Sequence, residues 1–344
     1  MTGSSRHVRR TRPLRVGLTH NLKRVNPVED DVEAEYDSPK TIRAIAGAIE
    51  SFGHRVVPIE ARPDIVRTLP AAKVDLVFNI AEGVRGRNRE AQIPALCELL
   101  GIPYTGSDAA TLAITLDKAL SKRLLREARI PTPDFFVMET GREPVPARWR
   151  FPAIVKPNLE GTSKGITAAS VVDDERSLRR KAGALIRRYR QPAIVEAFVS
   201  GREFTVGVVG ERPARVLPPM EVVFLQPSDR NVYEYSLKQD WTGRLEYVCP
   251  AHLGRAATRE MRRLALETFK TLGCRDVARV DFRTDRRGRP FVIEVNPLPG
   301  LTPNFSDLVM IAEAAGIDYR GLIGEILASA VRRADDERRR ERRA

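Results

Sequence analysis

Apolar and polar positions follow two different periods along the first third of the chain. Short apolar runs of strand length are separated by longer segments whose apolar residues recur at helical spacing. The segment at 38–56 opens with Ser-Pro and ends at a glycine, which are start and stop signals of a helix. Strands that alternate with helices are typical of a parallel α/β unit. We therefore expect such a unit over about residues 12–105, with strands at 14–20, 56–61 and 74–83 and helices at 38–56 and 90–102.

The rest of the chain combines amphipathic segments with apolar runs that precede polar turns. The segment "DKALSKRLLREAR" is amphipathic and is followed by Ile-Pro-Thr-Pro, which ends a helix. The stretch "VARVDFRTDRRGRPFVIEVN" predicts a strand, a polar turn and a second strand. The pattern predicts helices at 117–133, 174–190, 257–273, 307–318 and 319–334, and strands within 151–166, 192–209 and 277–296.

Composition limits the classes of function. The formal net charge of the 344 residues is +13, but residues 1–12 supply +4 of it and residues 332–344 supply +3. The body between them is mildly basic without interleaved aromatic residues, so we expect no nucleic-acid partner. No apolar run approaches the ~18 residues of a membrane span, so we expect no membrane partner. The three cysteines have neither metal-ligand nor disulfide spacing, which fits a cytoplasmic protein.

The strand-turn-strand segment ends in "VIEVNPLPG" at 292–300, where polar residues interrupt an apolar run. Alternate side chains of a strand share a face, so Arg279 and Asp281 lie together, as do Glu294 and Asn296. Cross-strand neighbours are about 5 Å apart, so Asp281, Glu294 and Asn296 can converge. Two carboxylates and an amide oxygen suit Mg²⁺. The alternative is a solvated hairpin face with a Glu–Arg pair.

A second informative stretch is "FPAIVKPNLEGTSKGI" at 151–166. An apolar strand delivers Lys156, one of only 10 lysines beside 48 arginines. Gly161 and Gly165 flank the small hydroxyl residues of the loop that follows, and the backbone of such loops can close over phosphate. No Walker A pattern is present, and Lys156 can bind a nucleotide phosphate as a point charge. The alternative is a surface lysine at a strand end.

The third stretch, "PAIVEAFVSGREFTVGV" at 192–208, places a glutamate at the end of one apolar run and another at the start of the next. These residues are Glu196 and Glu203. A segment that crosses between two small domains, with an acid able to accept from a ribose, explains this pattern. A plain β-hairpin with exposed acids explains it as well.

Six segments, taken in order, resemble the D-alanine–D-alanine ligases of the ATP-grasp superfamily. They are "GIPYTGS", "LDKALSK", "FPAIVKPNLEGTSKGI", "VEAFVSGREFTV", "TLGCRDVARVDF" and "VIEVNPLPGLTP". The resemblance extends from about residue 72 to about residue 330, and more faintly from residue 14. It implies an α/β chain with the ATP-grasp fold behind an N-terminal parallel α/β domain. The implied division is a disordered basic arm at 1–12, an N-terminal substrate domain at 13–113, a central subdomain at 114–200, a C-terminal subdomain at 201–331 and a charged tail at 332–344.

The resemblance also implies a nucleotide site with Mg²⁺ or Mn²⁺. Metal would be held by Asp281, Glu294 and Asn296, and Lys238 would reach the transferred phosphate from a mobile segment. The remaining ATP contacts implied by motif position are Lys118 and Lys156 on phosphates, Glu160, Thr162 and Ser163 on the phosphate loop, Glu196, Ala197 and Val199 at the adenine, and Glu203 at the ribose.

The chemistry that the resemblance implies has two steps. A carboxylate attacks the γ-phosphate of ATP to give an acyl phosphate, and an amine then displaces phosphate to form an amide. Thr162 and Lys238 would assist the first step, while Arg279 and the Gly300 N–H would stabilise the oxyanion of the second. The default product is D-alanyl-D-alanine, a peptidoglycan precursor. A homodimer is an analogy with the family only.

The departures from the family fall on substrate positions. Glu82 stands where the family has a histidine, and Arg89-Glu90 stand where it has an acidic pair. Gln239, directly after Lys238, replaces a family tyrosine. Phe305 replaces a serine that holds the acceptor carboxylate in the family, and Ser306 is adjacent. The glutamate that meets the first amino group is matched only by Glu35 or Asp37. A ligase for other amino acids or carboxylates is therefore the second hypothesis. A nucleotide- or nucleic-acid-binding protein without ligase activity is the third.

Overall fold

The computed structural model describes residues 12–24, 33–226, 228, 230–234, 237 and 242–343. Its first part is a parallel three-stranded sheet in the order β2-β1-β3, as the alternating pattern predicts. Ser38 caps the first helix by accepting from the Thr41 N–H, and Pro39 occupies the first turn. The elements are β1 (Arg15–His20), α1 (Pro39–Glu50), β2 (Arg55–Glu60), α2 (Ile65–Ala71), β3 (Leu76–Asn79) and α3 (Gln92–Leu100).

The central part is an antiparallel four-stranded sheet in the order β4-β7-β5-β6, and α6 packs on it. Two helices connect it to the parallel sheet, and the Asp117 carboxylate caps the second by accepting from the Leu120 N–H. The elements are α4 (Ala109–Leu116), α5 (Lys118–Glu127), β4 (Phe135–Met138), β5 (Ala153–Pro157), η1 (Ala168–Ser170), β6 (Val171–Val172), α6 (Glu175–Tyr189) and β7 (Ala193–Ala197).

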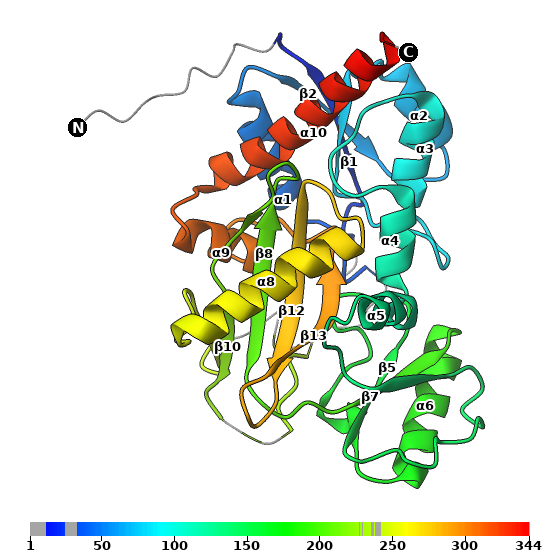
Figure 1. Cartoon of the computed structure of the whole chain (residues 1–344). Helices are drawn as coiled ribbons and strands as arrows, with labels where there is room; N and C mark the ends of the chain where they lie inside the picture. Colours follow the sequence, from blue (N-terminus) through cyan, green and yellow to red (C-terminus); the bar gives the residue numbers. More distant parts are fainter. Residues whose placement is uncertain are drawn as a thin grey trace.

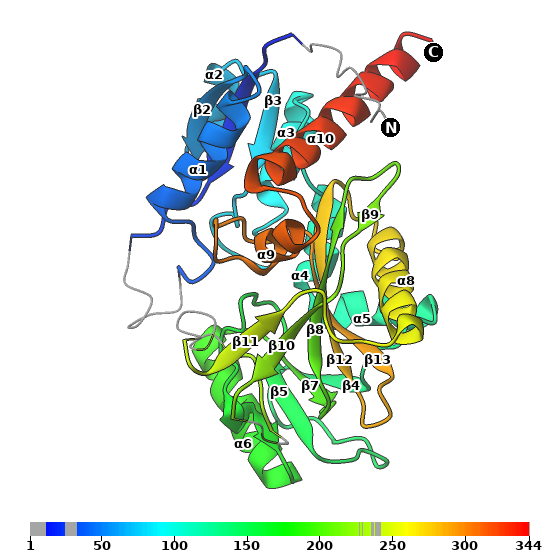
Figure 2. The same ribbon diagram turned by 90° about the vertical axis from the view of Figure 1, so that its left-hand side faces the viewer.

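The third part is a larger antiparallel sheet in the order β11-β10-β8-β12-β13, with β9 beside β8. Helix α8 lies across this sheet and buries its apolar face against the strands (Figure 1). In Figure 2 the large sheet lies between the parallel sheet at one end and the β5–β7 sheet at the other. The elements are β8 (Glu203–Val209), β9 (Arg215–Val216), β10 (Met220–Phe224), β11 (Leu245–Val248), α8 (Arg255–Thr271), β12 (Val277–Thr284) and β13 (Pro290–Asn296).

The segment that contains Glu196 and Glu203 crosses between two sheets. Strand β7 pairs with β4 and β5, whereas β8 pairs with β10 and β12. The Ser-Gly pair at 200–201 therefore joins two sheets and does not turn a hairpin. Of the two explanations that the sequence leaves open, the crossing segment is the right one.

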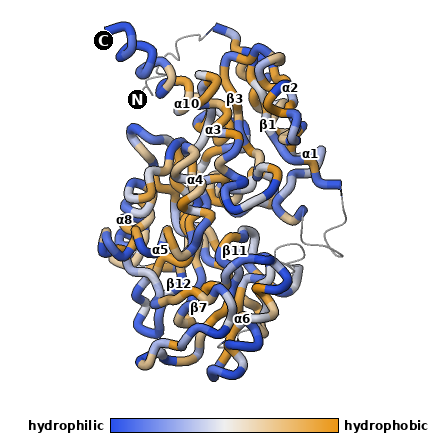
Figure 3. The backbone as a smooth tube through the Cα atoms, turned by 90° about the vertical axis from the view of Figure 1, so that its right-hand side faces the viewer, coloured by the Kyte–Doolittle hydropathy of each residue, from blue (hydrophilic) through white to orange (hydrophobic). Residues whose placement is uncertain are grey.

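The chain ends in α9 (Asp307–Ala314) and α10 (Tyr319–Glu341). Helix α10 packs against α1 and α9, and buried side chains of both C-terminal helices join the core of the parallel sheet. It continues through residues 332–341, where the sequence predicts a separate charged tail. The end of this helix is hydrophilic (Figure 3), but Arg333 folds back and pairs with Asp276. The helix propensity of the Arg- and Glu-rich run explains this difference.

Candidate active site

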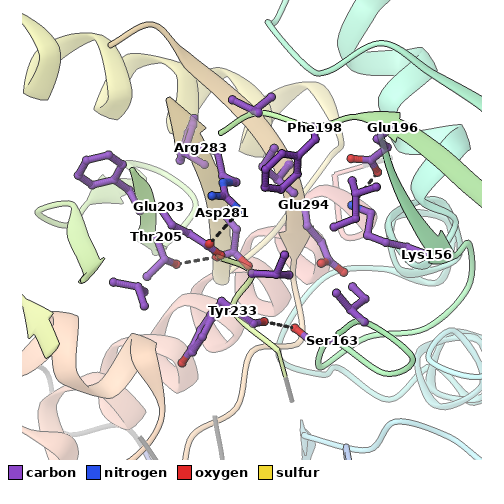
Figure 4. Close-up of a pocket in the computed structure, with 18 of the residues that line it drawn as sticks. Lys156, Ser163, Glu196, Phe198, Glu203, Thr205, Tyr233, Asp281, Arg283 and Glu294 are labelled. Atoms are coloured by element: carbon purple, nitrogen blue, oxygen red, sulfur yellow. Dashed lines mark hydrogen bonds and ion pairs between the residues drawn. The ribbon is translucent and has the colours of Figure 1, made fainter. Parts of the chain in front are cut away.

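A pocket opens between the four-stranded sheet and the large sheet, and we call it the intersheet pocket (Figure 4). Lys156 on β5 and Glu196 on β7 line one wall. Glu203, Asp281 and Glu294 on the large sheet line the other. The sequence singles out all five residues, and the fold brings them together although they are spread over more than a hundred positions.

The first wall contains a buried ion cluster. Lys156 Nζ lies 2.8 Å from Glu196 Oε1, and Lys122 Nζ of α5 lies 3.4 Å from Glu196 Oε2. Burial opposes ionisation, but the two ammonium groups hold the pKa of Glu196 below its usual value. Burial lowers the pKa of Lys122 to about 8. Two cations on one anion make this wall electropositive, and the sequence analysis missed Lys122.

The rim of the pocket is formed where β7 leads into β8. Ala197, Phe198 and Val199 line it, next to the carboxylate of Glu203. The guanidinium of Arg283 lies 4.9 Å from the centre of the Phe198 ring, and its Nη1 lies 3.5 Å from Glu203 Oε2. Arg283 was also missed by the sequence analysis, because its contacts are all remote in sequence.

The acids of the β12–β13 hairpin converge as the strand period predicts. Asp281 pairs with Glu294 and Arg279 pairs with Asn296 in the strand register. Asn296 Nδ2 donates to Asp281 Oδ2 over 3.3 Å. Glu294 Oε1 accepts from Lys118 Nζ at 2.8 Å. These side chains are half-buried and line pockets, so this face of the hairpin is not simply exposed to solvent.

The hairpin acids suit a hard cation. Within the described part of the chain no group of three His, Cys, Asp or Glu side chains forms a metal cluster. Asp281 and Glu294 offer two carboxylates, and the Asn296 side chain adds an amide oxygen. Mg²⁺ prefers one or two carboxylates and completes its shell with phosphate oxygens and water. This donor set therefore fits Mg²⁺ bound together with a phosphate ligand.

The loop after β5 carries the small hydroxyl residues. Thr162 and Ser163 both adopt left-handed backbone conformations, with φ of 49° and 59°. Ser163 Oγ donates to the Tyr233 carbonyl at 2.9 Å, so this loop is fastened to the segment after β10. Ser163 lines the intersheet pocket. Thr162 instead lines two further pockets on the side of the parallel sheet.

Those two pockets share residues and form one path. The inner pocket is lined by Glu82, Glu90, Gly161, Thr162, Glu294 and Asn296, among others. The outer pocket is lined by Asp37, Glu82, Tyr233, Arg279, Gly300 and Ser306, among others. Both are lined by Glu35, Glu82, Thr162, Asn296 and Leu298, and Glu294 also lines the intersheet pocket. A molecule in the inner pocket would therefore lie beside one in the intersheet pocket.

Arg279 stands at the base of the outer pocket. Its guanidinium lies 2.9 Å from Asp281 Oδ1 and 3.3 Å from Asp307 Oδ2. Burial alone would lower the pKa of the Arg279 guanidinium. The two carboxylates outweigh burial and raise this pKa, so Arg279 is a permanent cation. Gly300 is close to Ser306, whose Oγ a side chain at position 300 would approach to 3.0 Å.

Glu160 does not reach the intersheet pocket. Its carboxylate lies 3.2 Å from Lys164 Nζ and 3.5 Å from Arg89 Nη2, and it accepts from Gln191 Nε2 at 2.8 Å. Only its backbone carbonyl points to the site, where it accepts from Lys118 Nζ. The prediction that Glu160 contacts the nucleotide is therefore not supported for its side chain, because neighbouring cations hold the carboxylate away.

Glu35 is fully occupied by partners from other elements. Its Oε1 accepts from the Gly161 N–H at 2.8 Å, and its Oε2 lies 3.1 Å from both Arg89 Nη2 and Lys164 Nζ. The side chain is 5% exposed. Burial raises the pKa of Glu35, but the two cations outweigh it and keep the pKa low. Glu35 thus fastens the parallel domain to the loop after β5.

The remaining substrate candidates are distributed between the two pockets. Asp37 and Ser306 line the outer one, and Glu82 lines both. Glu90 lines the inner pocket and is only 8% exposed, although the sequence analysis noted it only as part of a departure. Lys238 lies outside the described residues.

Known proteins of one family resemble this chain in sequence. The family model described as the D-Ala D-Ala ligase C-terminus matches residues 124–328. The chain belongs to the D-alanine–D-alanine ligase family. A D-alanine–D-alanine ligase of Cupriavidus metallidurans is 36% identical over 289 residues, which are 83% of this chain and 85% of that protein. An uncharacterised Sinorhizobium fredii protein, y4sG, is 35% identical over 84% of this chain and 87% of its own length.

The fold has a close counterpart among solved structures. A D-alanine–D-alanine ligase of Bacillus anthracis, crystallised with ATP, superposes with a TM-score of 0.74 at 24% identity. The match covers 94% of this chain and 99% of that one. The expected ATP-grasp fold and the expected enzyme class, an ATP-dependent ligase that forms carbon–nitrogen bonds, are thereby confirmed. Every helix in the described part of the chain is too short or too polar to span a membrane.

Proposed function

We propose that this ligase uses ATP and Mg²⁺ to join the carboxylate of one small substrate to the amine of another. The observation that supports this best is the position of Glu294, which lines both the intersheet pocket and the inner pocket. A phosphate group beside Glu294 can therefore be reached from either side. A nucleotide in one pocket and a carboxylate in the other would meet at this residue.

The nucleotide is assigned to the intersheet pocket. The backbone of Ala197 and Val199 and the carboxylate of Glu196 suit the adenine, and Glu203 suits the ribose hydroxyls. Lys118, Lys156 and Ser163 suit the phosphates, which need cations and hydrogen-bond donors. Mg²⁺ held by Asp281, Glu294 and Asn296 would neutralise charge on the β- and γ-phosphate oxygens.

The chain's own residues position the reactants for two displacements. In the first, a carboxylate oxygen attacks the γ-phosphorus of ATP, and ADP leaves behind an acyl phosphate. Thr162, on the loop after β5, is assigned to orient the phosphate, and Lys238 is assigned to contact the same phosphate. In the second, an amine nitrogen attacks the acyl carbon, loses a proton and expels inorganic phosphate.

Arg279 and the Gly300 N–H are assigned to the oxyanion of the second step. Both line the outer pocket, and Arg279 stays charged because carboxylates surround it. A donor aimed at such an oxyanion typically lowers the barrier by about 3 kcal/mol. Ser306 is assigned to the acceptor's carboxylate in the same pocket. Water must be kept from the acyl phosphate, which would otherwise hydrolyse.

D-alanyl-D-alanine is one candidate product, since it is the product that the names of the relatives indicate. The second candidate is an amide between other amino acids. It is supported by Glu35, which Arg89 and Lys164 already occupy. Two cations already neutralise this carboxylate, so it would attract the ammonium of a first alanine less strongly than a free acid would. In either case we expect the enzyme to work in the cytoplasm, where ATP is available.

The test is phosphate release from Mg²⁺-ATP against a panel of D- and L-amino acids and small carboxylates, with products identified by mass spectrometry. Release that depends on D-alanine and yields its dipeptide would support the first candidate. Release with another pair would support the second. Phosphate release without any amide product, across the panel, would overturn the proposal of ligation for these substrate classes.

A further inference from the structure

Two carboxyl groups of the inner pocket have no partner among the residues that the structure describes. Neither the Glu82 nor the Glu90 side chain makes a hydrogen bond or an ion pair with any residue that the structure describes. Glu90 is buried, with 8% of its surface exposed. Both side chains line the pocket, so a ligand there would touch them.

The other acids nearby are compensated by cations of the chain. Glu294 has Lys118 at 2.8 Å, and Asp307 has Arg279 at 3.3 Å. Glu35 has both Arg89 and Lys164 at 3.1 Å. Among the described residues, the cations that pair with these acids form no ion pair with Glu82 or Glu90, although the charge of Arg89 lowers the pKa of both.

Unpaired carboxylates in such a place are costly for the free enzyme. Burial and the neighbouring carboxylates raise the pKa of Glu82 well above its usual value, and burial raises that of Glu90 to about 8. A positive group placed between them would remove this cost. The charge of the inner pocket therefore favours a ligand that carries a positive group.

An organic cation suits this pocket better than a metal ion. No third His, Cys, Asp or Glu side chain joins Glu82 and Glu90 in a metal-binding group within the described residues. Glu35 is the neighbouring acid that raises the pKa of Glu82 and of Glu90 most, but both of its oxygens already accept hydrogen bonds. An ammonium group has three donors, and the acceptor sites of two carboxylates suffice for two such groups.

The position of the pocket identifies the substrate that brings the cation. Its wall includes Thr162, Glu294 and Asn296, which the proposed function places around the transferred phosphate. The molecule that lies here must therefore be the carboxylate that attacks the phosphate. We propose that this carboxylate substrate is a diamino acid with a short side chain, whose two ammonium groups are received by Glu82 and Glu90.

This inference rests on the proposed ligase function and explains two departures from the family together. Arg89 stands where the family has an acid, and it neutralises Glu35. Glu82 stands where the family has a histidine, and it faces the same path. The ammonium site is thereby moved from Glu35 to Glu82, and Glu90 adds a second one.

The test compares diamino acids with neutral amino acids of the same shape. The pairs are 2,3-diaminopropionate with 2-aminobutyrate and 2,4-diaminobutyrate with norvaline, each as both enantiomers, with ADP release and amide products measured. Binding is measured separately by calorimetry in the presence of Mg²⁺ and a non-hydrolysable ATP analogue. We expect kcat/KM and affinity at least tenfold higher for the diamino acid of each pair, in one enantiomer.

Variants then assign the preference to residues. Glu82→Gln and Glu90→Gln keep the shape and remove the charge, and each should reduce the preference at least tenfold. Glu82→His should shift the preference toward neutral amino acids. Glu50→Gln, at an exposed position of α1, is the matched control and should leave the preference unchanged.

The outcomes separate this inference from the proposed function. Amide products from neutral amino acids, with diamino acids no better, would overturn the inference and leave the ligase function intact. Tight binding of a diamino acid that depends on Glu82, without any amide product, would support the inference and count against the ligase function. If diamino acids neither bind nor react, the inference is wrong.

Discussion

Asp281 and Glu294 lie directly opposite each other on β12 and β13, and the strand register shifts immediately after this pair. The bulge leaves the two carboxylates on the face that lines the intersheet pocket. Lys118 Nζ donates to Glu294, while Thr205 Oγ1 donates to Asp281 Oδ1 at 2.7 Å. Each acid is thus oriented by a partner outside the hairpin, as a metal ligand needs to be.

Glu294→Gln should abolish ATP turnover while the protein remains folded. The amide keeps the shape but removes one of two negative ligands, and Mg²⁺ needs the charge. We expect turnover to fall at least a hundredfold, measured as phosphate release at saturating ATP. Glu246→Gln, on β11 and exposed, is the control. Near-normal turnover of the Glu294 variant would refute the metal assignment.

Lys156→Arg should weaken ATP binding although the charge is kept. Lys156 is 4% exposed and its ammonium lies 2.8 Å from Glu196, so the planar guanidinium has no room to adopt the same position. We expect the KM for ATP to rise at least tenfold, measured by initial rates. Lys40→Arg, at an exposed position of α1, should leave it unchanged. An unaltered KM in the first variant would show that Lys156 does not contact the nucleotide.

The convergence of the hairpin acids could be predicted from the sequence, because side chains of a strand always alternate between its two faces. Once β12 and β13 pair, Asp281, Glu294 and Asn296 must share a face. The crossing from β7 to β8 could not be decided in this way. A Ser-Gly turn suits either a hairpin or a crossing, and only the pairing of each strand with distant strands distinguishes them.

Residues that act through contacts distant in sequence escaped prediction. Lys122 follows Lys118 by one helical turn but meets Glu196 only because α5 packs beside β7. Glu35 was a candidate from the sequence, but its pairing with Arg89 and Lys164, which lie on other segments, could not be predicted. The short helices α2 and α4 were missed as well, and α2 even contains Pro70, which usually excludes a helix.

Asp37→Asn should make stability less dependent on pH. Burial raises the pKa of the Asp37 carboxyl to about 7, against the opposing effect of Lys23. The folded state then holds a proton that the unfolded state releases near pH 4, so stability falls as the pH rises from about 4 to about 7. The variant cannot ionise, so it should gain on the order of 2 kcal/mol over the wild type between pH 5 and pH 8.

Thermal unfolding midpoints at pH 5 and pH 8 measure this difference. Asp64→Asn is the control, since Asp64 is exposed and makes no side-chain capping bond at α2. Parallel pH profiles of the wild type and the Asp37 variant would show that Asp37 ionises normally in the folded protein.

Arg333→Ala should destabilise the protein, even though Arg333 belongs to the charged C-terminal run, where most arginines are exposed. Arg333 Nη1 lies 2.6 Å from Asp276 Oδ1, and its Nη2 donates to the Tyr104 carbonyl at 2.7 Å. The Asp276 side chain is 0% exposed. Removing the guanidinium leaves a buried carboxylate with the Gly106 N–H as its remaining partner, which typically costs about 3 kcal/mol. The thermal unfolding midpoint should therefore fall by several degrees.

Two further variants make this prediction decisive. Arg338→Ala removes an exposed arginine of the same helix, 3.9 Å from Asp335, and should change stability by less than about 0.5 kcal/mol. Adding Asp276→Asn to Arg333→Ala removes the unpaired buried carboxylate and should restore part of the lost stability. If deleting residues 332–344 leaves the midpoint unchanged, the last turns of α10 are a solvated extension and the Arg333–Asp276 pair contributes nothing to the fold.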